Sequence, residues 1–247
     1  WVILIVLLIE VYYVLDQLLE LIRTSGNISD RASLKGIAAN PNITAFSIAN
    51  KLPFLIYLLF HSKKRIIKIL LSLILFGSLI CISAIQSRAS FLGVGLIYIS
   101  SLFILFFFKE KKKIRSQISL AFYIILPLIL SLLTNQMILA DKGADAFKRA
   151  SSISISEADN SIASRIRYYS HVYEQIKSEP IVGVGLGNWK IKSIEYDSKD
   201  INGYVVPYHA HSDFIQLGAE LGVVGFLLYL GIFLSAIYYV FVMIRFS

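Results

Sequence analysis

The residues best suited to chemistry lie in a short polar segment that leads into a long apolar run near the end of the sequence. Residues 208–225 read Tyr-His-Ala-His-Ser-Asp-Phe-Ile-Gln-Leu-Gly-Ala-Glu-Leu-Gly-Val-Val-Gly and contain His209 and His211. An imidazole has an ordinary pKa of about 6.5, which suits a general base at neutral pH. The two histidines are two residues apart, which is the wrong spacing for one helical face, and zinc sites need three or four converging ligands. We therefore expect a general base here and no metal, with an inert interfacial histidine as the alternative.

The apolar run that follows begins with a polar face. In a helix that starts near residue 212, Asp213, Gln216 and Glu220 share one side. Polar side chains on an otherwise apolar span must be buried against protein or water. This face is expected to support the histidines.

Arginines that could bind an anion occur at two places. Residues 161–178 carry an amphipathic pattern that predicts an interfacial helix, capped by one of residues 159–161 and ending before Pro180. Arg165 and Arg167 lie near its start, and Arg88 follows an apolar run in Gln-Ser-Arg-Ala-Ser. A guanidinium group can bind a phosphate through two parallel hydrogen bonds. The alternatives are a snorkelling side chain for Arg165 and a plain surface charge for Arg88. The apolar stripe of the helix consists of Ile162, Ile166, Tyr169, Tyr173 and Ile176.

A glycine-rich segment, Pro-Ile-Val-Gly-Val-Gly-Leu-Gly-Asn, occupies residues 180–188. Gly183, Gly185 and Gly187 free the backbone for tight turns and could let N–H groups approach a phosphate. A dinucleotide-binding loop is not expected, because no alternating strand and helix surround it. A simple glycine-rich turn is the favoured alternative.

The composition indicates a membrane protein. Hydrophobic residues make up 56% of the 247 positions and charged residues only 16%, against about 25% in soluble domains. The net charge of +8 is concentrated in two short loops, so a nucleic-acid partner is not expected. The single cysteine, Cys81, excludes an internal disulfide. The chain opens in an apolar run at Trp1, and we expect it to be part of a longer protein.

Six runs are long enough to cross a bilayer as helices. The two basic loops at residues 61–68 and 109–115 are placed in the cytoplasm by the positive-inside rule. We therefore expect spans 1–5 within residues 1–139, an extracytoplasmic loop at 140–213 and a re-entering span at 214–247. The expected spans are Trp1–Ile22, Ile43–Phe60, Ile66–Ile85, Phe91–Phe108, Ile118–Leu139 and Phe214–Ile244. The last is long enough to tilt, or to begin as an interfacial helix that breaks near Gly222 and Gly225.

Charged residues inside the first two spans need partners. The first span carries Glu10, Asp16 and Glu20 and should face a protein interior. Lys51 in the second span should pair with Glu10 or Asp16, or bind an anion.

The order of these motifs resembles the O-antigen ligase and polymerase superfamily. The resemblance covers roughly residues 36–240 and is most specific in residues 164–225. It rests on Asn40-Pro41-Asn42, Arg88, Arg165, the glycines of 180–188, His211-x-Asp213 and Glu220-x-Gly222-x-x-Gly225.

The resemblance implies an all-α integral membrane protein of about six spans in this chain, with amphipathic helices in its long outer loop. It implies a helical-class glycosyltransferase of the bacterial inner membrane, with an active site facing the periplasm and neither metal nor cofactor. The donor would be a glycan on undecaprenyl diphosphate, and the acceptor would be the lipid A-core or another lipid or glycan. His211 would be the general base, and Arg88 and Arg165 would bind the diphosphate. Supporting roles fall to Asp213, Glu220, Gly183, Gly185 and Gly187, with Arg167 and His209 as substitutes for Arg165 and His211.

Two departures from the family and two other functions remain open at this point. The family usually has Asn where this chain has Ser212, and about twice as many spans. A ligase is favoured over a polymerase that adds to a second lipid-linked repeat. A polysaccharide transporter would predict internal repeats and polar residues along several spans, and the sequence shows no such repeat.

Overall fold

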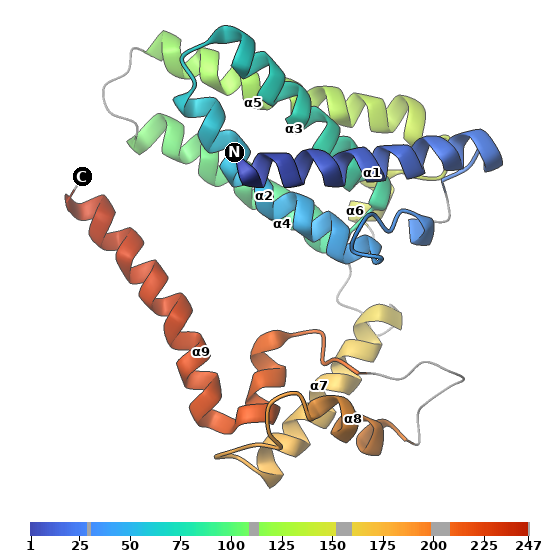
Figure 1. Ribbon diagram of the computed structural model, residues 1–247, viewed down its shortest axis with the longest axis vertical. Coiled ribbons are helices and arrows are strands. Elements are labelled where there is room, and N and C mark those ends of the chain that lie inside the picture. Colours follow the sequence, from blue (N-terminus) through green and yellow to red (C-terminus); the bar gives the residue numbers. More distant parts are fainter. Residues whose placement is uncertain (29–30, 109–113, 152–159, 199–207, 247) are drawn as a thin grey trace. The chain divides into compact units, whose positions relative to one another are not determined.

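The structure is a computed structural model that describes residues 1–28, 31–108, 114–151, 160–198 and 208–246 (Figure 1). It consists of two compact units, Trp1–Ile153 and Ser154–Ser247. Every regular element in these described ranges is helical, and six helices are long and apolar enough to cross a membrane. The expected all-α membrane fold is therefore confirmed.

In its described residues, the first unit contains five long helices and one short one. Two of the long helices end in a π-helical turn, Ile104–Phe108 after α4 and Asn135–Leu139 after α5, and a 3₁₀ turn lies at Arg31–Ser33. The helices are α1 (Val2–Ser25), α2 (Pro41–His61), α3 (Arg65–Ile85), α4 (Arg88–Phe103), α5 (Ile114–Thr134) and α6 (Ala146–Ser151).

Helix α3 organises the first unit, because it packs mainly against α2 and α5 and also contacts α1 and α4. Leu71, Leu75, Leu79 and Ile82 follow helical spacing and are all buried. The faces that point away from this core are also apolar, as expected of helices whose outer surface meets lipid.

Local chemistry sets where several of these helices begin and end. Asn40 caps α2, because its side-chain oxygen accepts hydrogen bonds from the N–H groups of Asn42 (2.9 Å) and Ile43 (3.2 Å). Pro41 occupies the first turn, where its missing N–H costs nothing. The Asn-Pro-Asn sequence is therefore a helix start. Gln86 ends α3 in the left-handed region (φ 58°), and α4 begins two residues later at Arg88.

The ends of α1, α3 and α5 are held together by the segment that follows α5. The N–H of Ile28 donates to Lys142 O at 2.6 Å, and Gln86 Nε2 donates to Gly143 O at 3.3 Å. Asn135 is fully buried and bonds the backbone of both Ala144 and Ala146. These bonds place residues 140–146 across one end of the bundle.

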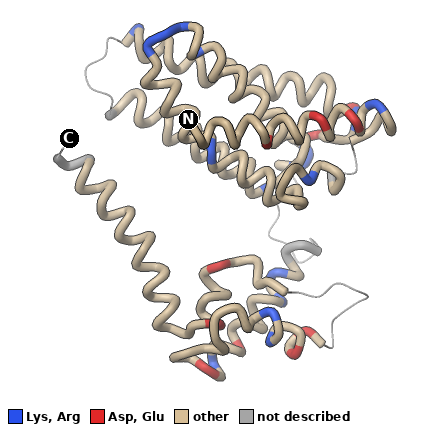
Figure 2. Tube along the Cα trace, in the orientation of Figure 1, with Lys and Arg blue, Asp and Glu red and all other residues tan. Residues whose placement is uncertain are grey.

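The opposite end of the first unit carries basic residues. Figure 2 shows Lys and Arg at the turn between α2 and α3, which corresponds to the first expected basic loop. Residues 109–113 of the second expected basic loop lie outside the described residues.

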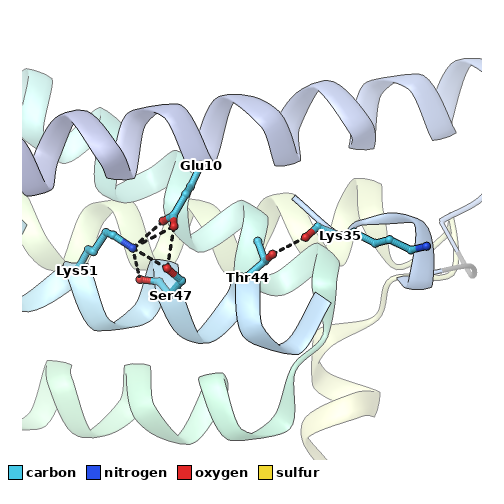
Figure 3. A network of polar contacts seen from close by, with 5 residues as sticks. All are labelled: Glu10, Lys35, Thr44, Ser47 and Lys51. Atoms are coloured by element: carbon cyan, nitrogen blue, oxygen red, sulfur yellow. Dashed lines mark hydrogen bonds and ion pairs between the residues drawn. The ribbon is translucent and has the colours of Figure 1, made fainter. Parts of the chain in front are cut away.

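The charged residues of the first span are only partly enclosed by this chain. Lys51 forms an ion pair with Glu10, with Nζ and Oε2 2.9 Å apart (Figure 3). Ser47 joins the pair, because its hydroxyl donates to Glu10 Oε1 at 2.7 Å and accepts from Lys51 Nζ at 2.6 Å. Asp16 and Glu20 are exposed on α1, so within this chain only Glu10 lies in a protein interior as expected.

The second unit contains α7 (Asn160–Ser178), α8 (Trp189–Asp197) and α9 (Asp213–Phe246). Helix α7 begins at Asn160. Of the three expected caps, Asp159 lies outside the described residues, so the capping of α7 stays a prediction. Helix α9 breaks at Gly222 (φ 65°, ψ −166°), as expected from its glycines. The part of α9 after the break is apolar and accounts for most of its spanning length.

The Glu10–Lys51 pair predicts strong coupling in stability. We expect Lys51→Met alone to lower the unfolding temperature in detergent more than the double substitution Glu10→Gln/Lys51→Met, because the single change leaves a partly buried carboxylate unpaired. The coupling energy should be about 0.5–3 kcal/mol. Glu20→Gln on the same helix is the exposed control, and strictly additive losses from the two single substitutions would contradict the coupling.

Candidate functional site

The candidate site of the second unit centres on His211, which directly precedes the first turn of α9. Its backbone lies in the left-handed region (φ 59°), where histidine is found more often than most non-glycine residues. The helix then starts with the N–H of Gln216 donating to Ser212 O at 2.9 Å. The His211 ring stacks on Tyr168 of α7, with ring centroids 5.9 Å apart and an interplanar angle of 28°.

The surroundings of His211 favour its neutral form. Partial desolvation lowers the pKa of His211 below its ordinary value although the residue is exposed at the surface, and the positive charge of Arg165 and the neighbouring His209 lower it further. Arg165 precedes Tyr168 by one turn of α7, so it lies on the same side of that helix. The structure thus brings together two of the three residues expected to do chemistry. Near neutral pH this arrangement favours a neutral imidazole beside a cation, which is able to accept a proton.

Glu220 and Gln216 hold the backbone next to His211. Glu220 is only 3% exposed, and its Oε2 accepts a hydrogen bond from the N–H of Gly187 at 2.9 Å. Its Oε1 accepts from Gln216 Nε2 at 3.0 Å. Gln216 Oε1 in turn accepts from the N–H of Ala210 at 3.1 Å. A chain of hydrogen bonds therefore runs from the buried carboxylate to the residue before His211. Asp213 lies exposed in the first turn of α9.

The glycine-rich segment docks onto the break in α9. A helix break leaves carbonyl groups without partners on one side and N–H groups on the other. Here the N–H groups of Val184 and Gly185 donate to the carbonyls of Ala219 (3.0 Å) and Glu220 (2.8 Å). The N–H of Val223, just after the break, donates to Pro180 O at 2.8 Å. These N–H groups are engaged within the protein, so the segment acts here as a glycine-rich turn that holds α9.

Two glycines allow this close approach. A Cβ on Gly183 would lie 2.4 Å from Ala219 O, and a Cβ on Gly222 would lie 2.2 Å from Ile181 O. Both residues also have positive φ. No L-residue with a side chain fits either position without moving the backbone.

Arg167 has a structural partner that the sequence analysis missed. Asp197 of α8 is 1% exposed, and its Oδ1 lies 3.0 Å from Arg167 Nε. His171 Nδ1 lies 3.7 Å from the same oxygen, and the His171 ring stacks on Tyr196. Arg167 and Asp197 are thirty residues apart and share no motif, so only their fold brings them together. Arg167 is thus tied to α8, whereas Arg165 lies beside His211.

An apolar groove of about 390 Å³ runs between α7 and the two parts of α9. Tyr169, Tyr173 and Ile176 of the expected amphipathic stripe line it from α7. Phe214 and Val223 line it from either side of the α9 break. The side chain of Ile162 lies outside the described residues, and Ile166 is exposed.

Arg88, the third expected residue, belongs to the first unit. It is the first residue of α4, is half-buried, and follows Ser87, which is buried and whose hydroxyl accepts a hydrogen bond from Ser90 at 3.1 Å. The site described above consists of residues of the second unit alone.

The helical fold, six candidate spans and a polar site beside an apolar groove define a multi-pass membrane protein. Its sequence matches the family described as O-antigen ligase over residues 73–230. The chain therefore belongs to the O-antigen ligase family, and all the candidate site residues lie inside the matched range.

A curated relative agrees with this assignment. The chain is 31% identical over 184 residues to a candidate polysaccharide ligase of Rickettsia conorii. That alignment covers 71% of this chain and 40% of the relative, so the chain spans less than half of that protein's length. No solved structure matches the chain.

The docking of the glycine-rich segment predicts different costs for two glycines. Gly183→Ala should lower the unfolding temperature and speed proteolysis within the second unit, because the new methyl group meets the Ala219 carbonyl. Gly187→Ala is the matched control, since its φ is also positive (80°) but nothing lies within 4 Å of the added Cβ. Equal losses for the two variants would show that strain at positive φ, and not close approach, decides the effect.

Proposed function

We propose that this chain carries the catalytic region of an O-antigen ligase-like glycosyltransferase. The reaction is transfer of a glycan from undecaprenyl diphosphate to a hydroxyl of an acceptor, the lipid A-core, at the periplasmic face of the inner membrane. One observation carries the proposal. His211, whose surroundings favour the neutral imidazole, lies against the side of α7 that carries Arg165 and Tyr168. Membership of the O-antigen ligase family supports it.

In this proposal His211 accepts the proton of the acceptor hydroxyl. The acceptor oxygen then forms a bond to the anomeric carbon of the donor glycan. The bond from that carbon to the diphosphate oxygen breaks, and the electron pair leaves with undecaprenyl diphosphate. Arg165 stabilises the negative charge that develops on this leaving group. Arg88 is the second proposed cation for the diphosphate, and Glu220 and Gln216 position the segment that carries His211.

The membrane orientation follows from charge. The basic turn between α2 and α3 is proposed to face the cytoplasm. With that orientation, the loop between α5 and α9 is proposed to face the periplasm. The apolar groove between α7 and α9 would accommodate part of a lipid chain, since it is lined by aromatic and aliphatic side chains.

The reaction is tested by transfer in vitro. The full-length protein in detergent is given a polyprenyl-diphosphate-linked glycan and lipid A-core without divalent metal. We expect transfer to the core, and a loss of about 10²–10⁴-fold in rate for His211→Ala, because general base catalysis contributes that much. Arg165→Ala and Arg88→Ala should also lose rate, and Arg165→Lys should retain part of it because the charge remains.

His61→Ala is the matched control, because His61 ends α2 in the first unit and its ring lies against Tyr57. Lengthening of lipid-linked repeats in place of transfer to the core would identify a polymerase of the same family. Donor binding without either product would favour a transporter. Full activity of His211→Ala would remove the proposed base.

The lowered pKa of His211 predicts the pH profile. A base works when deprotonated, so the rate should rise with pH through the His211 pKa and level off above it. Because that pKa lies below the ordinary value, the acid limb should lie below about pH 6.5. Removing the positive charge in Arg165→Gln should raise the pKa and move the limb to higher pH, whereas Arg165→Lys should leave it nearly in place. The profile of kcat/KM, with His211 followed by NMR titration, measures both, and an unmoved limb in Arg165→Gln would contradict the electrostatic coupling.

A further inference from the structure

A basic pocket lies at the end of the first unit where α3 and α5 begin. It has a volume of about 610 Å³, and four cations line it: Lys63, Arg65, Lys68 and Arg115. Among the described residues that line it, none is acidic. The proposed transfer reaction does not use this pocket, which belongs to a different part of the chain.

Helices α3 and α5 start side by side at this pocket (Figures 1 and 2). Ser72 of α3 donates to the carbonyl of Tyr123 in α5 at 2.8 Å. These residues are seven and nine positions from the starts of their helices, so the two helices run parallel and in register. The positive ends of both helix dipoles therefore point the same way. Dipoles and side chains together favour an anion here.

One of the cations, Lys68, lies against an aromatic ring, a contact that a charge serving only to set topology would not need. Lys68 Nζ lies over the ring of Tyr123, 5.8 Å from its centroid. This contact holds the ammonium group against the wall of the pocket. The positive-inside rule requires only that basic residues occur in a cytoplasmic loop. Lys68 and Arg115 lie instead within the first turns of their helices.

The pocket changes from basic to apolar along α5. Arg115, Ile118 and Phe122 follow one another at helical spacing, so they share a face. Ile118 is 59% exposed and Phe122 is 57% exposed, although both are large and apolar. A charged group at the helix ends and an apolar strip beyond it match the headgroup and acyl chains of a phospholipid.

We propose that this pocket binds the phosphate headgroup of an anionic glycerophospholipid, with an acyl chain lying along Ile118 and Phe122. Phosphate oxygens accept hydrogen bonds from Lys68 and Arg115, and the exposed Lys63 and Arg65 add positive potential. Basic pockets between membrane helices on the cytoplasmic side bind anionic lipids in this way. The lipid anchors the ends of α3 and α5 at the membrane surface.

The test is lipid selectivity of the full-length protein. Detergent-purified protein is exchanged into mixed micelles that contain phosphatidylglycerol and phosphatidylcholine in equal amounts, and retained lipid is counted by native mass spectrometry. The wild type should retain phosphatidylglycerol preferentially. Lys68→Gln/Arg115→Gln should reduce this preference about tenfold or more, since each cation near a membrane surface contributes several-fold to anionic lipid binding.

Two further variants keep the result interpretable. Arg23→Gln/Lys148→Gln removes the same charge from two exposed positions at the other end of the first unit and should leave the preference unchanged. Lys68→Arg/Arg115→Lys keeps the charge and should keep the preference for phosphatidylglycerol. This variant tests the role of charge even where the glutamine variant folds poorly.

Three outcomes would overturn the proposal. The first is equal retention of the two lipids by the wild type. The second is an equal loss of preference in the Arg23/Lys148 variant, which would show an effect of net charge alone. The third is that inorganic phosphate at millimolar concentration binds with the same dependence on Lys68 and Arg115 while no lipid preference exists, which would assign the pocket to a free anion.

Discussion

The break in α9 at Gly222 is the constraint on which the second unit depends. A long apolar helix can be interrupted only where protein groups satisfy the freed backbone, because a bilayer offers no hydrogen bonds. Residues 180–187 satisfy it on both sides of the break, and Glu220 adds a side-chain bond to Gly187. The same Glu220 holds Gln216, which holds Ala210. This chain of hydrogen bonds extends from the break in α9 to Ala210. It therefore helps to hold the next residue, His211, in its left-handed backbone conformation.

Two arginines of α7 that are two positions apart, Arg165 and Arg167, differ in environment because their side chains leave the helix on different sides. Arg167 meets the buried Asp197, and that ion pair fixes α8 against α7. Arg165 is exposed and acts electrostatically on His211. A charge already neutralised by a carboxylate is a poorer partner for a diphosphate than one whose neighbour is a neutral imidazole. This difference favours Arg165 over Arg167 as the proposed phosphate-binding residue.

The sequence predicted the helices well and the site only in part. Apolar runs of spanning length identified all six candidate spans, and Gly222 marked the break, since both depend on local composition. The pairing of Lys51 with Glu10 was one of the alternatives considered, because a charge inside a span needs a partner. Asp197 was missed, since its contact with Arg167 depends on how α8 folds back on α7 and leaves no periodic signal. The sequence also did not predict that the glycine-rich segment holds α9. This contact depends on carbonyl groups that lie more than thirty residues away in the sequence.

Charge in this chain is used in two distinct ways, and the presence of a carboxylate partner separates them. The Glu10–Lys51 pair is enclosed with Ser47 and has its partners within the bundle, so it contributes to assembly. Asp197 and Arg167 do the same for α7 and α8. The cations around Lys68 and the Arg165–His211 pair are different, because the described residues that line the pocket, or that shift the pKa of His211, include no carboxylate. A positive group near an apolar surface without an acidic neighbour retains its full attraction for an external anion. The charge at both places therefore agrees with the phosphate-bearing ligands proposed for them, one at the ends of α3 and α5 and one beside the groove of α7 and α9.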